Sequence, residues 1–407
     1  MGLHSITGAI GTGFDGHGRV RKLGLSLALL LAVAVPPPAS AYSVLAHEAM
    51  IDAAWADQLA PMLRQRFPGA SAAQVARARA YAYGGSLIQD LGYYPFGSHF
   101  FTDLVHYVRS GDFVAALIRD ARDVDEYAFA LGALAHYASD NTAHPQAVNR
   151  ALPIVYPKLH AKFGDEVLFT QSPARHVMVE FSFDVLQVAR GTFKPDAYQN
   201  LIGFEVATPL LERAFRETYG LELDDVFGNV DLAIGTYRRA ASKTIPDITR
   251  VAWREKRDEI LAAAPSITER DFVYTLTEAD YQRTFGTTYR KPGLFARLVV
   301  AIFKVLPKFG PFRPLAFTPL DEQTGRLFLD SFAASRERFG TLLRSVRDGR
   351  FSISDTDLDT GKAPVRGVNA LADKTYAELR KKLARTKNVV IPPALRRALD
   401  EHDRITR

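Results

Sequence analysis

The stretch Leu134-Ala135-His136-Tyr137-Ala138-Ser139-Asp140 decides how this chain is interpreted. It ends a segment from Asp123 that is rich in Ala, Leu and aromatic residues at helical spacing. On a helix, residues four apart project on nearly the same side, so His136 and Asp140 would share one face. Their small and apolar neighbours would bury both groups, and a buried carboxylate needs a partner. That partner is either a metal ion or the histidine itself, in a His–Asp pair within the core.

A second pair with the same spacing lies in Arg175-His176-Val177-Met178-Val179-Glu180-Phe181. His176 and Glu180 again stand among apolar residues, and Asp184 continues the same line, where it could orient His176 or replace Glu180. One such pair is weak evidence for a metal site. Two pairs in one chain favour a metal centre.

Further candidates flank these two segments. His144 follows the first pair by one turn, and Pro145 places it at the helix end, because proline disfavours helical geometry in the residue before it. The loop Gln89-Asp90-Leu91-Gly92-Tyr93-Tyr94-Pro95-Phe96-Gly97-Ser98-His99-Phe100 supplies Asp90 and His99. Loops rich in Gly, Pro and aromatic residues often carry functional sites.

The first 41 residues have the pattern of a secretory signal. A basic part precedes a 13-residue apolar run, Leu23 to Val35, and Ala39-Ser40-Ala41 has the form of a cleavage site. The run is too short to span a bilayer comfortably, although an uncleaved anchor is the alternative. We therefore expect an exported protein, periplasmic or extracellular, that begins at Tyr42. The amine and carbonyl of Tyr42, with His47 five residues later, could then hold a metal ion.

The composition limits the kind of metal site. The 407 residues include no cysteine, so a metal would be bound by His, Asp, Glu and backbone atoms. This donor set suits hydrolytic zinc rather than a thiolate structural site. The formal charge of +6 favours an anionic substrate or surface only slightly.

The periodicity is helical along the whole chain, which predicts an all-α fold. We expect a signal at 1–41, a catalytic domain at 42–290, and a helical C-terminal region of unknown role at 291–407, after the breaker Lys291-Pro292-Gly293. The expected helices are 44–59, 123–140, 173–188, 208–219, 294–306, 321–347 and 369–385. The segment 294–313 joins an apolar helix to basic residues and phenylalanines, which indicates a core helix or a peripheral membrane contact.

Several residues with metal-binding side chains are not expected to bind one. His106 is expected in the core or on the surface, His160 is expected not to be a ligand, and His402 is expected in a solvated C-terminal tail. Three aspartates near Gly361 do not have the spacing of a calcium loop and are expected to form a solvated turn: Asp355, Asp357 and Asp359.

Residues 42–190 resemble the zinc-dependent phospholipase C family and its relatives, the fungal zinc single-strand nucleases. The best matches are Phe96-Gly97-Ser98-His99-Phe100 and the stretch 134–140. The family is mostly helical and holds three zinc ions. The resemblance implies three ligand sets, with Asp140 bridging the first two: Tyr42, His47 and Asp140; Asp90, His99, His136 and Asp140; His176, Glu180 and one more histidine.

The chain departs from the family at the last histidine. The family places it six residues after the bridging aspartate, where this chain has Gln146, and we expect His144 to take its role. The aromatic and acidic residues of the choline-recognising enzymes are replaced here by Leu91 and by Ser43 and Val44, so a choline head group is not indicated.

Three functions follow from this resemblance. The first is a phosphoric diester hydrolase, a phospholipase C, in which Asp90 is the general base and Phe96 and Phe100 contact the substrate. The second is a nuclease that uses the same centre, with Phe100 stacking on a base of single-stranded nucleic acid. The third is a non-catalytic binding protein that keeps the fold. The segment 294–313 and the lack of cysteine favour a phospholipid over nucleic acid, and no protein partner is indicated.

Overall fold

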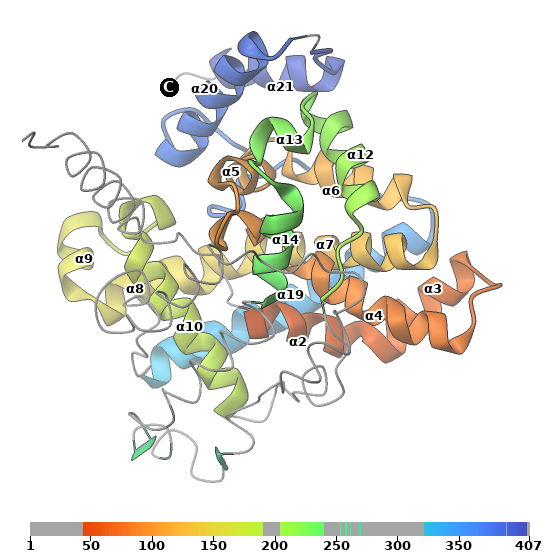
Figure 1. Ribbon diagram of the computed structural model, residues 1–407. Coiled ribbons are helices and arrows are strands. Elements are labelled where there is room, and N and C mark those ends of the chain that lie inside the picture. The colour runs from red at the N-terminus through yellow and green to blue at the C-terminus, as the bar shows by residue number, and fades with distance from the viewer. Residues whose placement is uncertain are drawn as a thin grey trace, which may run out of the picture.

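The computed structural model describes residues 44–189, 204–239 and 321–404, apart from residue 388, together with six isolated positions between 253 and 269. Every regular element within these ranges is a helix, and an isolated bridge between Asp357 and Lys362 is the one β feature there. The all-α prediction is confirmed (Figure 1).

The described helices follow one another along the chain in this order: α2 (Val44–Ala54), α3 (Ala60–Arg66), α4 (Ala72–Ser86), α5 (His99–Tyr107), α6 (Ser110–Asp120), α7 (Val124–Ala143), α8 (Asn149–Val155), α9 (Pro157–Phe163), α10 (Pro173–Ala189), α12 (Thr208–Tyr219), α13 (Leu223–Val226), α14 (Val230–Arg239), α19 (Glu322–Arg347), α20 (Ala370–Arg385) and α21 (Pro393–Arg404). Short π and 3-10 turns complete them: η1 (Trp55–Leu59), η2 (Ile88–Tyr93), η3 (His144–Val148) and η4 (Phe169–Gln171).

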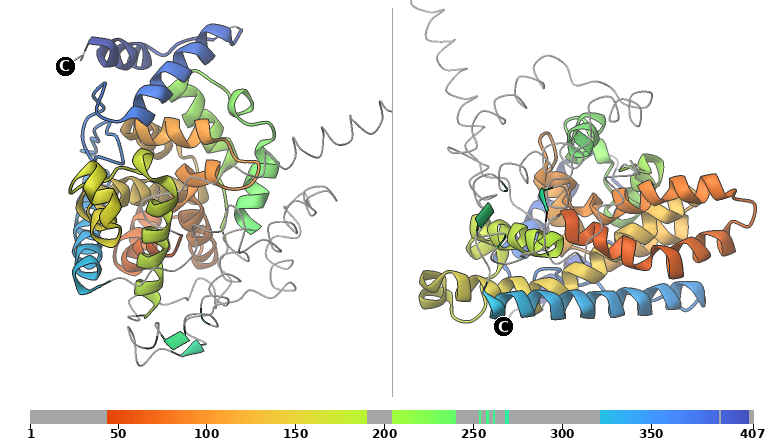
Figure 2. Two further views of the ribbon diagram at one scale, coloured as in Figure 1. Left: turned by 90° about the vertical axis from the view of Figure 1, so that its left-hand side faces the viewer. Right: turned by 90° about the horizontal axis from the view of Figure 1, so that it is seen from below.

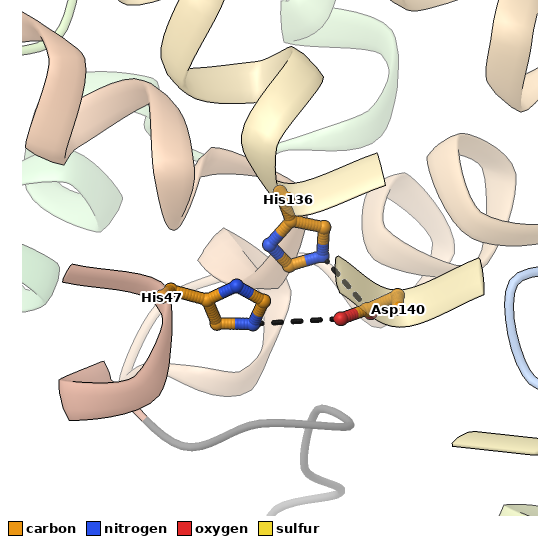
Figure 3. Close-up of side chains that lie close together, drawn as sticks. All are labelled: His47, His136 and Asp140. Carbon is orange, nitrogen blue, oxygen red and sulfur yellow. Dashed lines mark ion pairs between the residues drawn. The ribbon is translucent and has the colours of Figure 1, made fainter. Parts of the chain in front are cut away.

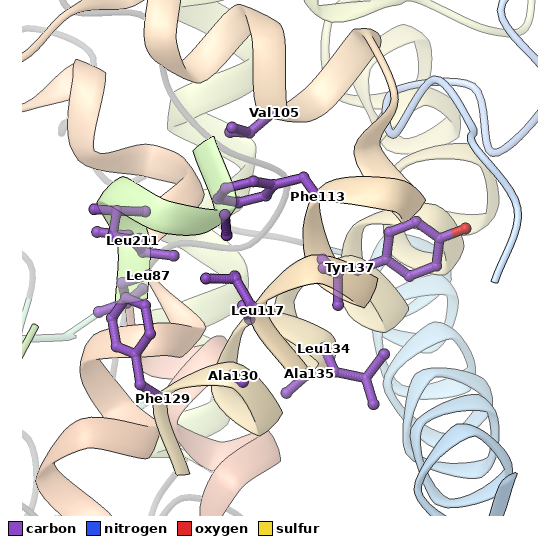
Figure 4. Packing of buried hydrophobic residues seen from close by; sticks show 14 of the residues in the cluster. Leu87, Val105, Phe113, Leu117, Phe129, Ala130, Leu134, Ala135, Tyr137 and Leu211 are labelled. Carbon is purple, nitrogen blue, oxygen red and sulfur yellow. The ribbon is translucent and has the colours of Figure 1, made fainter. Parts of the chain in front are cut away.

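Helix α7 is the central element of the fold. The Asp123 carboxylate caps its start by accepting hydrogen bonds from two backbone N–H groups of the first turn. Almost every later residue of α7 is buried, and α4, α6 and α19 pack around it. Figure 4 shows the apolar side chains that fill this core. A helix enclosed on all sides can hold polar side chains away from water.

Glycines bring α4 and α7 unusually close together. A β-carbon at Gly85 would lie 2.0 Å from the Phe129 carbonyl oxygen, and one at Gly132 would lie 2.1 Å from the Ala82 carbonyl oxygen. Only residues without a β-carbon fit at such a contact. This close approach fixes the position of α7 relative to α4 and to η2, which follows α4.

The chain does not leave the helix at His144, where Pro145 predicts an end. His144 has helical backbone angles, and α7 continues into the π-helical turn η3. The wider π turn accommodates a proline, which lacks a backbone N–H to donate. As a result, His144 lies on the continuation of the helix that carries His136 and Asp140.

The described part of the C-terminal region packs directly on the N-terminal helices. Helix α19 runs alongside α7, and α20 packs against α5 (Figures 1 and 2). Phe328 of α19 stacks on Phe183 of α10, with ring centroids 4.7 Å apart. The predicted helices 321–347 and 369–385 correspond to α19 and α20, and helix 294–306 lies outside the described residues.

Candidate metal centre

His136 and Asp140 lie one turn apart near the end of α7, and both side chains are fully buried. His136 Nε2 is 3.1 Å from Asp140 Oδ2, and His136 Nδ1 donates to the Ser86 carbonyl 2.9 Å away. His47 of α2 stacks on His136 with ring centroids 4.3 Å apart, and its Nε2 lies 3.5 Å from Asp140 Oδ1 (Figure 3). These three residues form the first group of possible metal ligands.

A second group consists of Asp90 of η2, His106 of α5 and the same His136. His106 Nε2 lies 3.6 Å from Asp90 Oδ1 and 3.4 Å from Asp140 Oδ2. The Nδ1 of His106 donates to the Thr102 carbonyl at 2.9 Å, so its Nε2 faces the carboxylates. Backbone carbonyls orient metal-binding imidazoles in this way in many proteins.

A third group consists of His144 of η3, His176 of α10 and Asp359, which lies between α19 and α20. His144 Nδ1 is 3.0 Å from Asp359 Oδ1, and His176 Nε2 is 3.9 Å from the same oxygen. The two imidazoles stack with centroids 5.0 Å apart. His144 Nε2 also lies 3.7 Å from Asp140 Oδ2, which links this group to the others.

Asp140 lies among four imidazoles. The Nε2 atoms lie 3.1 to 3.7 Å from its two oxygens, yet none of these contacts has hydrogen-bond geometry. A buried carboxylate without such bonds is costly. Imidazole nitrogens and carboxylate oxygens are the donors that zinc takes when cysteine is absent. The arrangement therefore fits metal ions between these groups.

The pKa values show what balances the charges without a metal. Burial opposes the charge on His136, but Asp140 and Asp90 outweigh it and raise its pKa to about 9. Burial likewise opposes the charge on His144, but Asp140 and Asp359 raise its pKa to about 10. Burial also opposes the charge on Asp140, but the surrounding imidazoles hold its pKa well below the usual range. Protons therefore occupy positions that metal ions can take.

The family model described as zinc dependent phospholipase C matches residues 46–229. Residues 46–229 of this chain therefore match the zinc-dependent phospholipase C family. No curated protein and no solved structure matches it. The predicted family is confirmed, and its zinc dependence agrees with the buried histidines and carboxylates. The matched segment includes every residue of the first two groups, and of the third it lacks Asp359.

The second group of possible metal ligands contains His106 where the sequence suggested His99. His99 is exposed at the start of α5, with its ring 6.1 Å from that of Tyr93. Seven residues make nearly two turns, so His99 and His106 project from almost the same face, about 10 Å apart along the helix. The buried end of α5 holds His106 against the carboxylates. The seven-residue spacing was the available signal. His106 was predicted in the core or on the surface, and it is buried, with its Nε2 facing the carboxylates.

Glu180 and Asp184 have different roles, which the sequence spacing alone could not distinguish. Glu180 Oε1 meets Nδ1 of His176 at 2.6 Å, on the side of the ring away from Asp359. Asp184 accepts hydrogen bonds from the backbone N–H groups of Leu45 and Ala46, both at 3.0 Å, and so caps the start of α2. It therefore holds α2, which carries His47, against α10.

The remaining predicted residues surround the centre. Tyr42 lies outside the described residues. Phe96 is half-buried in the loop after η2, with φ of +65°, a strained angle for a phenylalanine. Phe100 is half-buried too, and packs against the main core. The prediction of a solvated turn at Asp355, Asp357 and Asp359 is wrong for two of them, because Asp357 and Asp359 are 2 % and 1 % exposed.

Proposed function

We propose that this chain is an exported zinc-dependent phosphodiesterase that acts as a phospholipase C on the head-group phosphodiester of a phospholipid. One observation carries the proposal: four buried imidazoles surround Asp140, and all four lie with it in the segment matched by the family. The three groups could hold up to three zinc ions, with Asp140 bridging and Tyr42 completing the first.

The chain's own residues prepare the site for hydrolysis. When bound, zinc would supply Lewis acidity toward a phosphoryl oxygen and would lower the pKa of a nearby water molecule. Asp140 stays negatively charged, and the backbone carbonyls of Ser86 and Thr102 fix the rings of His136 and His106. Asp90, at the edge of the second group, is the proposed general base that orients water and takes its proton.

The substrate follows from features around the centre. The description of the family names phospholipase C, and the segment 294–313 combines apolar and basic residues that suit a peripheral membrane contact. Within the described residues, no helix has the length and apolar character needed to cross a bilayer. Phe96, in the loop after Asp90, and Phe100, at the start of α5, are the proposed contacts with the substrate.

The test compares two substrates and two variants. Protein that begins at Tyr42 is expected to hydrolyse mixed phospholipid vesicles, to lose this activity on chelation, and to recover it with zinc. His136→Ala is expected to lose metal and activity together, whereas Ser139→Ala, a buried neighbour on α7, is expected to keep both. Cleavage of single-stranded DNA without phospholipid hydrolysis would show that the substrate is nucleic acid and not a phospholipid. Full activity in the His136→Ala variant would refute the proposal that these residues form the catalytic metal centre.

A further inference from the structure

The third group contains a residue from outside the family segment. Asp359 lies 130 residues beyond residue 229, where the match ends, and its side chain is 1 % exposed. Its Oδ1 lies 3.0 Å from Nδ1 of His144, but neither atom makes a hydrogen bond. Two buried polar atoms that face each other in this way are expected to share a third partner.

We propose that Asp359 is a metal ligand, and that the C-terminal region thereby completes the third site together with His144 and His176. The proposal rests on the metal centre of the proposed function, not on the nature of the substrate. In this arrangement His144 takes the place of the histidine that Gln146 replaces, and the carboxylate of the site comes from the C-terminal region instead of from Glu180.

The Oδ2 atom of Asp359 makes a hydrogen bond to the backbone, and this bond fixes the orientation of Oδ1. Oδ2 accepts a hydrogen bond from the backbone N–H of Phe169 at 3.1 Å. The Asp359 carbonyl accepts one from Nδ2 of Asn149 at 2.8 Å, and Oδ1 of Asn149 meets Nε2 of His176 at 3.0 Å. Asn149 therefore positions Asp359, and Oδ1 of Asp359 is left facing the two imidazoles. A metal ion at Nε2 of His176 would replace the contact of that nitrogen with Asn149.

The loop that carries Asp359 is held against the centre at several points. The Leu358 N–H donates to the carbonyl of His106, at 3.1 Å, and Ser110 Oγ donates to the Thr356 carbonyl at 2.6 Å. Gly361 follows with φ of +68°, and a β-carbon there would lie 2.7 Å from the carbonyl oxygen of Asn141. These contacts hold the Asp359 carboxylate beside His144 and His176.

Glu180 is the competing carboxylate, and its geometry assigns it a different task. It bonds Nδ1 of His176, and the nitrogen nearest Asp359 is Nε2. A histidine that binds metal through one nitrogen commonly donates from the other to a carboxylate, which fixes the ring. Glu180 is thus a positioning residue for His176, and Asp359 is the ligand.

The test counts metal ions in three single variants by elemental mass spectrometry. Asp359→Asn is expected to lose one ion per chain and to keep the others, because asparagine can still accept from Phe169 but is a far weaker ligand. Asp357→Asn is the matched control, since Asp357 is equally buried in the same loop but bonds Asn369, and it is expected to keep every ion. Glu180→Gln is expected to keep the ion with about 10- to 100-fold weaker affinity.

The locations are checked on the unaltered protein by zinc anomalous diffraction from crystals. A peak within bonding distance of Asp359 and both imidazoles is expected, and this measurement does not depend on how the variants fold. A peak bonded to Glu180 with Asp359 remote, or a full metal count in Asp359→Asn, would overturn this inference and leave the proposed function standing. Unaltered protein without any zinc would overturn both.

Discussion

Replacing Asp140 with asparagine tests the centre most directly, because this one carboxylate faces four imidazoles at 3.1 to 3.7 Å. Asparagine keeps the volume and removes the charge. The first group would lose its only described carboxylate, and the second would keep only Asp90. We therefore expect two of the three proposed zinc ions to be lost or much weakened.

The size of the effect follows from mass action. A site at a ligand concentration of about 100 times its Kd adds about 2.7 kcal/mol to the free energy of unfolding, so two sites add about 5 kcal/mol. At roughly 2 to 4 °C per kcal/mol for a domain of this order of size, the loss in Tm is on the order of 10 °C.

The assay is thermal unfolding of the zinc-loaded and the chelated forms. The gap in Tm between these forms is expected to shrink in Asp140→Asn and to stay unchanged in Ser139→Ala, whose hydroxyl is buried on the same helix without a hydrogen bond. Comparing gaps removes any cost that the substitution has in the metal-free protein. An unchanged gap, with an unchanged metal count, would refute the bridging role of Asp140.

Three further predictions follow from the described residues. Replacing His106 with alanine is expected to remove metal from the second group, while His99→Ala keeps the full count, as measured by elemental mass spectrometry; the opposite pattern would restore the original assignment. The pKa values of His136 and His144 are raised to about 9 and 10, because nearby carboxylates outweigh burial, so their stabilisation of the metal-free protein is complete below pH 6.5 and is lost as the pH rises through 9 to 10. Zinc binding at neutral pH should then release about two protons from this pair, measurable by calorimetry in buffers of different ionisation enthalpy, and no release would contradict the shifts. A methyl group at Gly132 would meet a backbone carbonyl of α4 at 2.1 Å, so Gly132→Ala is expected to lower the free energy of unfolding by about 1–3 kcal/mol or more in denaturant titrations, and an unchanged midpoint would contradict the close packing.

Local periodicity predicted much of the fold. The expected helices 123–140 and 208–219 correspond to α7 and α12, because apolar residues at helical spacing are a property of neighbouring residues. Local spacing also placed His136 with Asp140, and His176 with Glu180, each on one face. It could not say which nitrogen of His176 faces the centre.

The sequence by itself determined that this chain forms helices and carries zinc-type donors without cysteine, because both properties depend on residue identity and short spacing. Only the tertiary structure decided between His99 and His106, which share a face of α5 and differ in which end of that helix is buried. It also brought Asp359 to His144, more than 200 residues away in the chain. Such a contact depends on how α19 packs along α7 and where the following loop returns, and no local pattern records it, because packing joins surfaces rather than neighbours in sequence.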